Sequence, residues 1–296
     1  TVAVYSPIQY TPQAVGIKLA SIFTNRSILL AYAGRLMNMI FAIAMIYMAI
    51  KIIPVGKKML FALAFFPIFI EGVVTLSPDG ITNVSSILFI AYILRLLKNK
   101  AVGNRDVVIL TTLGIVIGLS KIVYIPLVFL ALLLPKKYFK NNKSYWISIL
   151  IILLSSVMAN LTWLCISSRY LALYRNGASS VQTHYVLTHL IEYAQILLGT
   201  IGENFDYYFM TLIGRDLAWG GLVVVYPIII YAIFLLFIVG CTNENNKIKD
   251  LYTKKNLFII FVILLCIIGL VFTSLFVQWT RPGVFIISGV QGRYFL

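Results

Sequence analysis

The feature that most constrains this chain is a series of long apolar blocks separated by short basic stretches. A helix of about 20 residues, rising 1.5 Å per residue, matches the roughly 30 Å hydrocarbon core of a bilayer. Blocks of about this length cover approximately residues 29 to 50, 59 to 76, 81 to 97, 144 to 164, 220 to 240 and 257 to 277. They are apolar on every face, whereas strands of a membrane barrel alternate apolar and polar residues. The pattern therefore predicts transmembrane helices and an all-α fold.

Composition excludes a soluble domain. Of the 296 residues, 61% are hydrophobic and 11% are charged, whereas soluble globular domains carry about 25% charged residues. A soluble fold of this size still needs polar side chains for the surface that it leaves exposed. We therefore predict a polytopic integral membrane protein in a lipid bilayer, folded as one transmembrane domain over residues 1 to 296.

Two further apolar runs, residues 107 to 120 and 122 to 134, are shorter than a full span. Ser120 and Lys121 separate them, so we predict a hairpin of two short helices. Arms of this length reach roughly 21 Å, which places the Lys121 ammonium below the outer membrane surface rather than in bulk water.

The net charge of +15 would point to nucleic acid in a soluble protein, but the placement of the charges indicates otherwise. Of the 24 basic residues, 15 gather in four segments between helices: Lys51, Lys57 and Lys58; Arg95, Lys98, Lys100 and Arg105; Lys136, Lys137, Lys140 and Lys143; and Lys247, Lys249, Lys254 and Lys255. This is the positive-inside pattern of cytoplasmic loops. We expect no nucleic-acid partner.

With those segments in the cytoplasm, the helices alternate in direction and both ends of the chain are extracytoplasmic. The chain has no initiator Met and no amino-terminal signal segment, so we expect at least one further helix before it and one after it. The cytoplasmic loops are short, so we expect the working surface outside, at residues 1 to 28, 77 to 83, 165 to 219 and 278 to 296.

Residues 165 to 219 mix charged, aromatic and aliphatic side chains, which predicts an extracytoplasmic loop with interfacial helices. Within it, residues 186 to 200 carry apolar side chains at helical spacing. His184 and His189 are five residues apart and do not share a helical face as an i, i+4 pair does, so no metal site is predicted. The absence of a P-loop or a GxSxG elbow gives no support to ATP-driven transport or hydrolase chemistry.

Four motifs bear on identity: "YSPIQYTPQAVGI" at residues 5 to 17, "LSPDGITN" at 76 to 83, "GLSKIVYIPL" at 118 to 127 and "GVQGRYFL" at 289 to 296. In this order they resemble a bacterial membrane-protein family known as domain-of-unknown-function family 2142, over essentially the whole chain. Residues 212 to 227 resemble that family's "iGxlGW…P" segment, with Ala218 in place of the Gly before Trp.

That family is similar in architecture to the GT-C glycosyltransferases, which transfer a sugar from a polyprenyl-phosphate carrier outside the cytoplasm. The resemblance implies a GT-C-like bundle in a bacterial plasma membrane, a polyprenyl-phosphate-linked sugar as partner, and a role in cell-envelope glycan assembly. Those enzymes carry an acidic catalytic residue in the first extracytoplasmic loop, so we expect that residue upstream of Thr1. The cofactor is unknown, and a divalent cation is one option.

Three basic residues are candidates for binding an anionic substrate group. Lys121 matches the lysine of the family's "GLsKpxYlPl" motif and can neutralise phosphate as a point charge; the alternative is an interhelical tether to Asp79 or Glu71. Arg35 lies inside the first span, where an isolated charge costs about 2.5 to 3.5 kcal/mol, so it either binds an anion, pairs with a carboxylate or snorkels to the interface. Arg293 offers a planar fork suited to phosphate, or has a purely structural role.

Three further candidates lie in the external motifs. Asp79 stands between Pro78 and Gly80, which is the chemistry of a tight turn, and it is also the acidic residue of the matching motif. Tyr5 and Gln13 belong to a segment that resembles the family's "YxPxxYxPQ" motif, where aromatic faces stack on sugars or form part of an interfacial belt.

The sequence leaves open whether the chain is an enzyme. The first hypothesis is a GT-C-type glycosyltransferase. The second is a transporter or flippase of lipid-linked oligosaccharide, although such proteins typically show internal repeats and we find no convincing one here. The third is a non-catalytic scaffold of an envelope complex.

Overall fold

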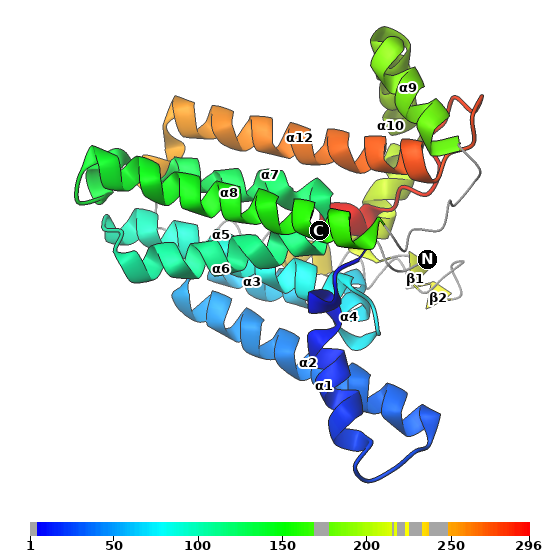
Figure 1. The fold of residues 1–296 in the computed structure, drawn as a ribbon, viewed down its shortest axis with the longest axis horizontal. Helices are drawn as coiled ribbons and strands as arrows, with labels where there is room; N and C mark the ends of the chain where they lie inside the picture. The colour runs from blue at the N-terminus through cyan, green and yellow to red at the C-terminus, as the bar shows by residue number, and fades with distance from the viewer. Residues whose placement is uncertain (1–4, 169–177, 215, 218–222, 225–232, 237–247) are drawn as a thin grey trace.

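The structure is a computed structural model. It describes residues 5 to 168, 178 to 214, 216 to 217, 223 to 224, 233 to 236 and 248 to 296. Long helices lie side by side in a bundle (Figure 1).

The longer helices are α1 (Thr11–Ala20), α2 (Ser27–Ile52), α3 (Lys57–Ala64), α4 (Pro67–Val74), α5 (Asp79–Asn99), α6 (Asn104–Ser120), α8 (Asn142–Ser167), α9 (Ala178–Thr188), α10 (Leu190–Ile213) and α12 (Lys254–Gln278). The short elements are α7 (Ile125–Val128), the 3-10 turns η2 (Pro7–Tyr10), η3 (Ile122–Tyr124), η4 (Phe129–Leu133), η5 (Lys136–Tyr138), η6 (Lys249–Tyr252) and η7 (Gly292–Phe295), and the strands β1 (Asp216–Leu217) and β2 (Val223–Val224). The predicted helical membrane fold is confirmed, and the two-residue strands are a local exception.

Four of the described helices are long and apolar enough to cross a membrane: α2, α5, α8 and α12. They confirm the predicted spans at 29 to 50, 81 to 97, 144 to 164 and 257 to 277. The apolar stretch of α5 is 67% buried, whereas those of the other three are 17 to 22% buried. α5 is therefore the central helix, and α2, α8 and α12 present apolar side chains outward, as lipid-facing helices do.

The prediction of one helix over residues 59 to 76 is wrong. The chain forms α3 and α4 instead, and Phe66 between them is extended, with φ −61° and ψ 130°. Pro67 causes the break, because its ring disfavours a helical conformation at the preceding residue and it has no N–H to donate. α4 then buries Ile68, Phe69 and Val73 in a small cluster with α2 residues.

The prediction of a span over residues 220 to 240 is wrong at Val223 and Val224. These form β2, which pairs antiparallel with β1 and follows the helix end at Gly214, where φ is 106°. β-branched valines suit such a ladder. Residues 233 to 236 are helical, and the rest of the predicted span lies outside the described residues.

The short hairpin is confirmed. α6 ends at Ser120, Lys121 is extended with φ −142° and ψ 129°, and the chain returns through η3, α7 and η4 as a short apolar helical segment, Ile122–Leu133. The returning arm has 3-10 character, since Pro126 cannot donate a helical hydrogen bond.

The external segment forms helices but not the single helix predicted over 186 to 200. α9 ends at Thr188 and α10 begins at Leu190, because His189 between them is not helical, with φ −124° and ψ 53°. The ring of Tyr185 stacks on that of His189 at 4.8 Å. Leu187, Leu190 and other large apolar residues on both helices are exposed, and the interfacial position of these helices stays a prediction.

The basic segments lie together at one end of the bundle. Residues 51 to 58, 95 to 105, 136 to 143 and 254 to 255 are all found where α2 and α5 end and where α6, α8 and α12 begin, at the left in Figure 1. Lys247 lies outside the described residues. This one-ended charge agrees with the predicted topology, and the cytoplasmic assignment of that end stays a prediction.

The hairpin is held against α8 by close helix contact at Gly118. A Cβ at this position would collide with the carbonyl oxygen of Ser156, and the Asn160 side-chain amide donates to the Gly118 carbonyl oxygen at 2.8 Å. Small residues allow such close approach between membrane helices.

We predict that Gly118→Ala lowers the stability of the protein by about 1 to 3 kcal/mol, because the added methyl group overpacks the α6–α8 contact. The measurement is the apparent unfolding temperature in detergent. Gly269→Ala in α12 is the matched control, since no atom lies within 4 Å of a Cβ built there. Equal unfolding temperatures for the two variants would contradict the prediction.

Candidate functional site

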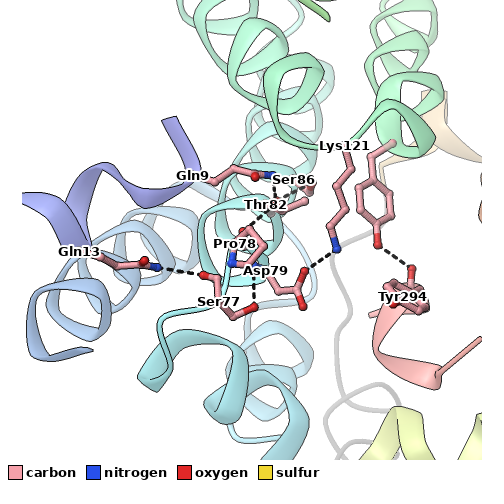
Figure 2. Close-up of polar contacts among 10 residues, drawn as sticks. Gln9, Gln13, Ser77, Pro78, Asp79, Thr82, Ser86, Lys121 and Tyr294 are labelled. Carbon is pink, nitrogen blue, oxygen red and sulfur yellow. Dashed lines mark hydrogen bonds and ion pairs between the residues drawn. The ribbon is translucent and has the colours of Figure 1, made fainter. Parts of the chain in front are cut away.

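Charged and aromatic residues from four segments meet at the end of the bundle opposite the basic loops. Lys121 comes from the α6–η3 turn, Asp79 from the first residue of α5, Tyr5 from the segment before η2, and Arg293 and Tyr294 from η7. Figure 2 shows the Lys121 side chain directed at the Asp79 carboxylate. These five residues are called the Lys121 cluster below.

The centre of the cluster is an ion pair. Lys121 Nζ lies 2.5 Å from Asp79 Oδ1, and the two side chains are only 11% and 17% exposed. The interhelical tether to Asp79, considered as the alternative role of Lys121, is therefore present. It joins the start of the central helix to the tip of the short hairpin.

Local structure explains why a carboxylate is found at this position. Asp79 opens α5, where the positive end of the helix dipole favours an acidic side chain. Its backbone N–H donates to Ser77 Oγ at 3.2 Å, and Thr82 Oγ1 donates to the Pro78 carbonyl oxygen at 3.0 Å. Asp79 is thus both a turn residue and a member of the cluster, and its role in binding a substrate stays a prediction.

Aromatic rings surround the Lys121 ammonium. Its Nζ lies 5.9 Å from the ring centroid of Tyr5 and 5.2 Å from that of Tyr294. Such cation–π contacts stabilise a charge most where water is excluded. The Tyr124 hydroxyl donates to the carbonyl oxygen of Tyr294 at 3.0 Å (Figure 2), which fixes η7 beside the hairpin.

Arg293 is the second cation of the cluster. Its guanidinium carbon lies 5.4 Å from the ring centroid of Tyr294. Its Nε is buried and has no hydrogen-bond partner in the described part of the chain. Burial alone would lower the pKa of Arg293, but Tyr294 and Asp79 raise it above its usual value. The group is therefore charged and holds an unused donor.

Arg293 lines a small polar pocket together with both carboxylates of this region. The pocket has a volume of about 40 Å³ and is lined by Glu71, Asp79, Ser77, Asn83 and Arg293, among others. That volume has room for about three water-sized groups. The pocket can therefore receive the oxygen atoms of a small anionic group, but not an entire sugar.

Contacts with α10 and α12 hold the η7 turn that carries Arg293. The backbone N–H of Gly292 donates to Thr211 Oγ1 of α10 at 2.8 Å, and the ring of Phe295 stacks on Phe272 of α12 with a centroid distance of 6.0 Å. A Cβ at Gly292 would overlap the α10 backbone. Only glycine allows η7 to approach α10 this closely.

Side-chain amides hold the turn that precedes Asp79. Gln13 Nε2 donates to the Ser77 carbonyl oxygen at 2.9 Å, Gln9 Nε2 donates to Thr82 Oγ1 at 3.2 Å, and both contacts are drawn in Figure 2. From α2, Asn38 Nδ2 donates to the carbonyl oxygens of Val73 and Thr75 at 2.9 and 3.1 Å. In this structure Gln13 positions the turn.

Gln9 and Asn38 did not emerge from the sequence as site residues. Asn38 had a usable signal, since a polar side chain inside a span seeks a partner within the protein. Gln9 lies within the first external motif, but nothing else in the sequence distinguishes it from a glutamine on the protein surface.

Arg35 is not part of the cluster. It is exposed on α2, and its guanidinium carbon lies 5.7 Å from the ring centroid of Tyr32 on the same helix. Its proposed anion-binding role stays a prediction. In the part of the chain that the structure describes, no three His, Cys, Asp or Glu residues gather as a metal site would require.

The apolar helices and the charged cluster at one end define the class of the molecule, a helical integral membrane protein. All 296 residues match the family described as "Predicted membrane protein (DUF2142)", and the chain belongs to that family, as its motifs predicted. No curated protein and no solved structure matches the chain.

We predict that Asp79→Asn destabilises the protein by about 3 to 5 kcal/mol, because it leaves the buried Lys121 ammonium without its counter-charge. The double variant Asp79→Asn, Lys121→Met should recover most of this loss, since both charges are gone. Apparent unfolding temperatures of the four proteins in the double-mutant cycle measure the coupling. Additive effects of the two substitutions would show that the ion pair is energetically unimportant.

Proposed function

We propose that this chain is the membrane domain of a GT-C-type glycosyltransferase that takes a sugar from a polyprenyl-phosphate carrier in a bacterial plasma membrane. The reaction takes place at the extracytoplasmic face and serves cell-envelope glycan assembly. The observation that carries the proposal is the half-buried Arg293 side chain, which lines a polar pocket and whose buried Nε has no hydrogen-bond partner among the described residues.

A phosphate group suits this pocket chemically. Arginine presents parallel N–H donors that match two phosphate oxygens, and charge-assisted hydrogen bonds of this kind are about twice as strong as neutral ones. Lys121 adds a second positive charge close by, although Asp79 balances it. In the proposal Arg293 contacts the phosphate, and Lys121 positions Asp79 at the edge of the pocket.

The location also supports a lipid-linked donor. The cluster lies at the bundle end opposite the basic loops (Figure 1), and the positive-inside pattern predicts that this end is extracytoplasmic. A long polyprenyl chain remains in the bilayer while its phosphate reaches this level. Tyr5 and Tyr294 offer aromatic faces on which a sugar ring can stack.

One observation favours the alternative of a flippase for lipid-linked oligosaccharide. Transporters build their sites from helices that are interrupted within the membrane. Here the helical chain is interrupted at Phe66 and Pro67, between α3 and α4, and α4 lines the pocket. The two functions differ in outcome, because a flippase moves its lipid across the bilayer unchanged, whereas a glycosyltransferase separates the sugar from the carrier.

We predict that Arg293→Gln weakens the binding of a polyprenyl phosphate to the purified full-length protein about 10- to 100-fold, the value of a hydrogen bond to a charged group. Affinity is measured by titration in detergent. Arg281→Gln is the control, because Arg281 is also near the carboxyl end but exposed. Equal affinities for the polyprenyl phosphate and the uncharged polyprenol would exclude a phosphate site.

We predict that Lys121→Ala reduces the turnover of a polyprenyl-phosphate sugar. The substitution removes the ion pair that holds the Asp79 carboxylate, so Asp79 no longer keeps its position in the pocket lining. The measurement is release of the sugar from the radiolabelled carrier. Lys18→Ala, a change at an exposed lysine of α1, should leave turnover unchanged. Normal affinity and turnover in Lys121→Ala would refute a role of Lys121 in the site.

A further inference from the structure

A second feature lies at the other end of α6, where a groove runs between α6 and α8. It has a volume of about 560 Å³ and its walls are mainly apolar, with Val107 and Val108 on α6 and Ile147 and Ile151 on α8. Lys143 lines it at the first turn of α8. This is the size of typical ligand pockets, about 300 to 1,000 Å³. We call it the α6–α8 groove.

Three exposed cations belong to the groove lining or stand next to it in the sequence. Lys143 is one of its lining residues, and Arg105 and Lys140 directly adjoin the lining residues Asn104 and Asn141. The segments that precede α6 and α8 are tied together, since the Val102 N–H donates to the Tyr138 carbonyl oxygen at 2.9 Å. The charges therefore belong to one structural unit.

The carboxylate of Asp106, next to the lining residue Val107 in the sequence, is already engaged. Asp106 accepts hydrogen bonds from the Tyr92 hydroxyl at 2.7 Å and from the Gly103 N–H at 2.8 Å. Lower in the groove, Thr111 Oγ1 is buried and has no hydrogen-bond partner within the described residues. The groove thus combines a positive mouth, apolar walls and one unused hydroxyl group.

We propose that the α6–α8 groove is a binding site for an acidic phospholipid of the leaflet at the basic end of the bundle. The phosphate of the lipid lies against Lys143 and its neighbours, and an acyl chain lies along the valine and isoleucine walls. Basic pockets between transmembrane helices bind acidic lipid headgroups in this way.

Charge and position favour this occupant over another protein helix. The groove faces outward, with Val108 63% exposed, and a partner helix would bury the Lys143 ammonium without a counter-charge, whereas a lipid phosphate supplies one. The site is independent of the glycosyltransferase proposal, because it lies at the opposite end of α6 from Lys121 (Figure 1).

The test uses full-length protein reconstituted in vesicles of phosphatidylcholine and phosphatidylglycerol, then extracted in mild detergent. Mass spectrometry counts the lipids that stay bound. We expect phosphatidylglycerol to be enriched over its share in the vesicle. Lys143→Gln should reduce the enrichment about fivefold, the contribution of one basic residue near an anionic lipid surface. Val108→Trp should abolish it by filling the groove.

Two controls are matched to these variants. Lys98→Gln removes the same charge at the same end of the bundle outside the groove, and Ile109→Trp adds the same bulk at the next residue of α6, which does not line it. Both should retain wild-type enrichment. The binding of polyprenyl phosphate should be unchanged in Lys143→Gln, so that failure of this proposal is distinguishable from failure of the proposed function.

Three results would overturn the proposal. The first is equal retention of phosphatidylcholine and phosphatidylglycerol by the wild-type protein. The second is an equal loss of enrichment in Lys98→Gln and Lys143→Gln. The third is a photoreactive residue at position 147 that crosslinks to protein rather than lipid, which would make the groove a protein interface.

Discussion

The ion pair between Lys121 and Asp79 joins segments that are far apart in the sequence. It connects the first residue of the central helix α5 to the tip of the hairpin that begins with α6. An unpaired charge at this depth would cost several kcal/mol, so each residue requires the other. Because Tyr5 and Tyr294 also contact the Lys121 ammonium, this pair helps to place both the amino-terminal segment and η7.

The non-helical residues between α4 and α5 impose a second constraint. Irregular backbone near a bilayer must find hydrogen-bond partners within the protein. Asn38 and Gln13 provide them for the carbonyl oxygens of Val73, Thr75 and Ser77. The turn is therefore held by side chains of α1 and α2, and the Asp79 carboxylate is fixed with it. For the proposed phosphate ligand, this preorganisation would reduce the conformational entropy lost on binding.

The parts of the fold that depend on length and apolarity were predictable. α2, α5, α8 and α12 follow from unbroken apolar blocks. The predictions failed at Pro67, at His189 and at Val223, where a local backbone preference or a tertiary contact overrides a hydropathy average. The mean hydropathy of an apolar block does not show where a helix breaks inside that block. A prediction based on apolar blocks therefore misses these three positions.

The motifs pointed to residues that the fold brings together, but their geometry was not predictable. Lys121, Asp79 and Arg293 were all candidates, yet only the folded chain shows that two of them pair, while Arg293 Nε has no partner among the described residues. Arg35 was included because a charge inside a span is costly, but the sequence did not show which face of the helix the residue lies on. Its exposed face on α2 separates it from the cluster.

The two ends of α6 have different chemistry but share one rigid element. α6 has 17 residues and is therefore about 25 Å long, with the α6–α8 groove at its start and Lys121 directly after its end. Close contact at Gly118 fixes α6 against α8 near the second end. The proposed lipid groove and the Lys121 cluster therefore share one helix but use different side chains at its two ends. Because no residue belongs to both, a substitution in the groove and a substitution in the cluster test the two proposals separately.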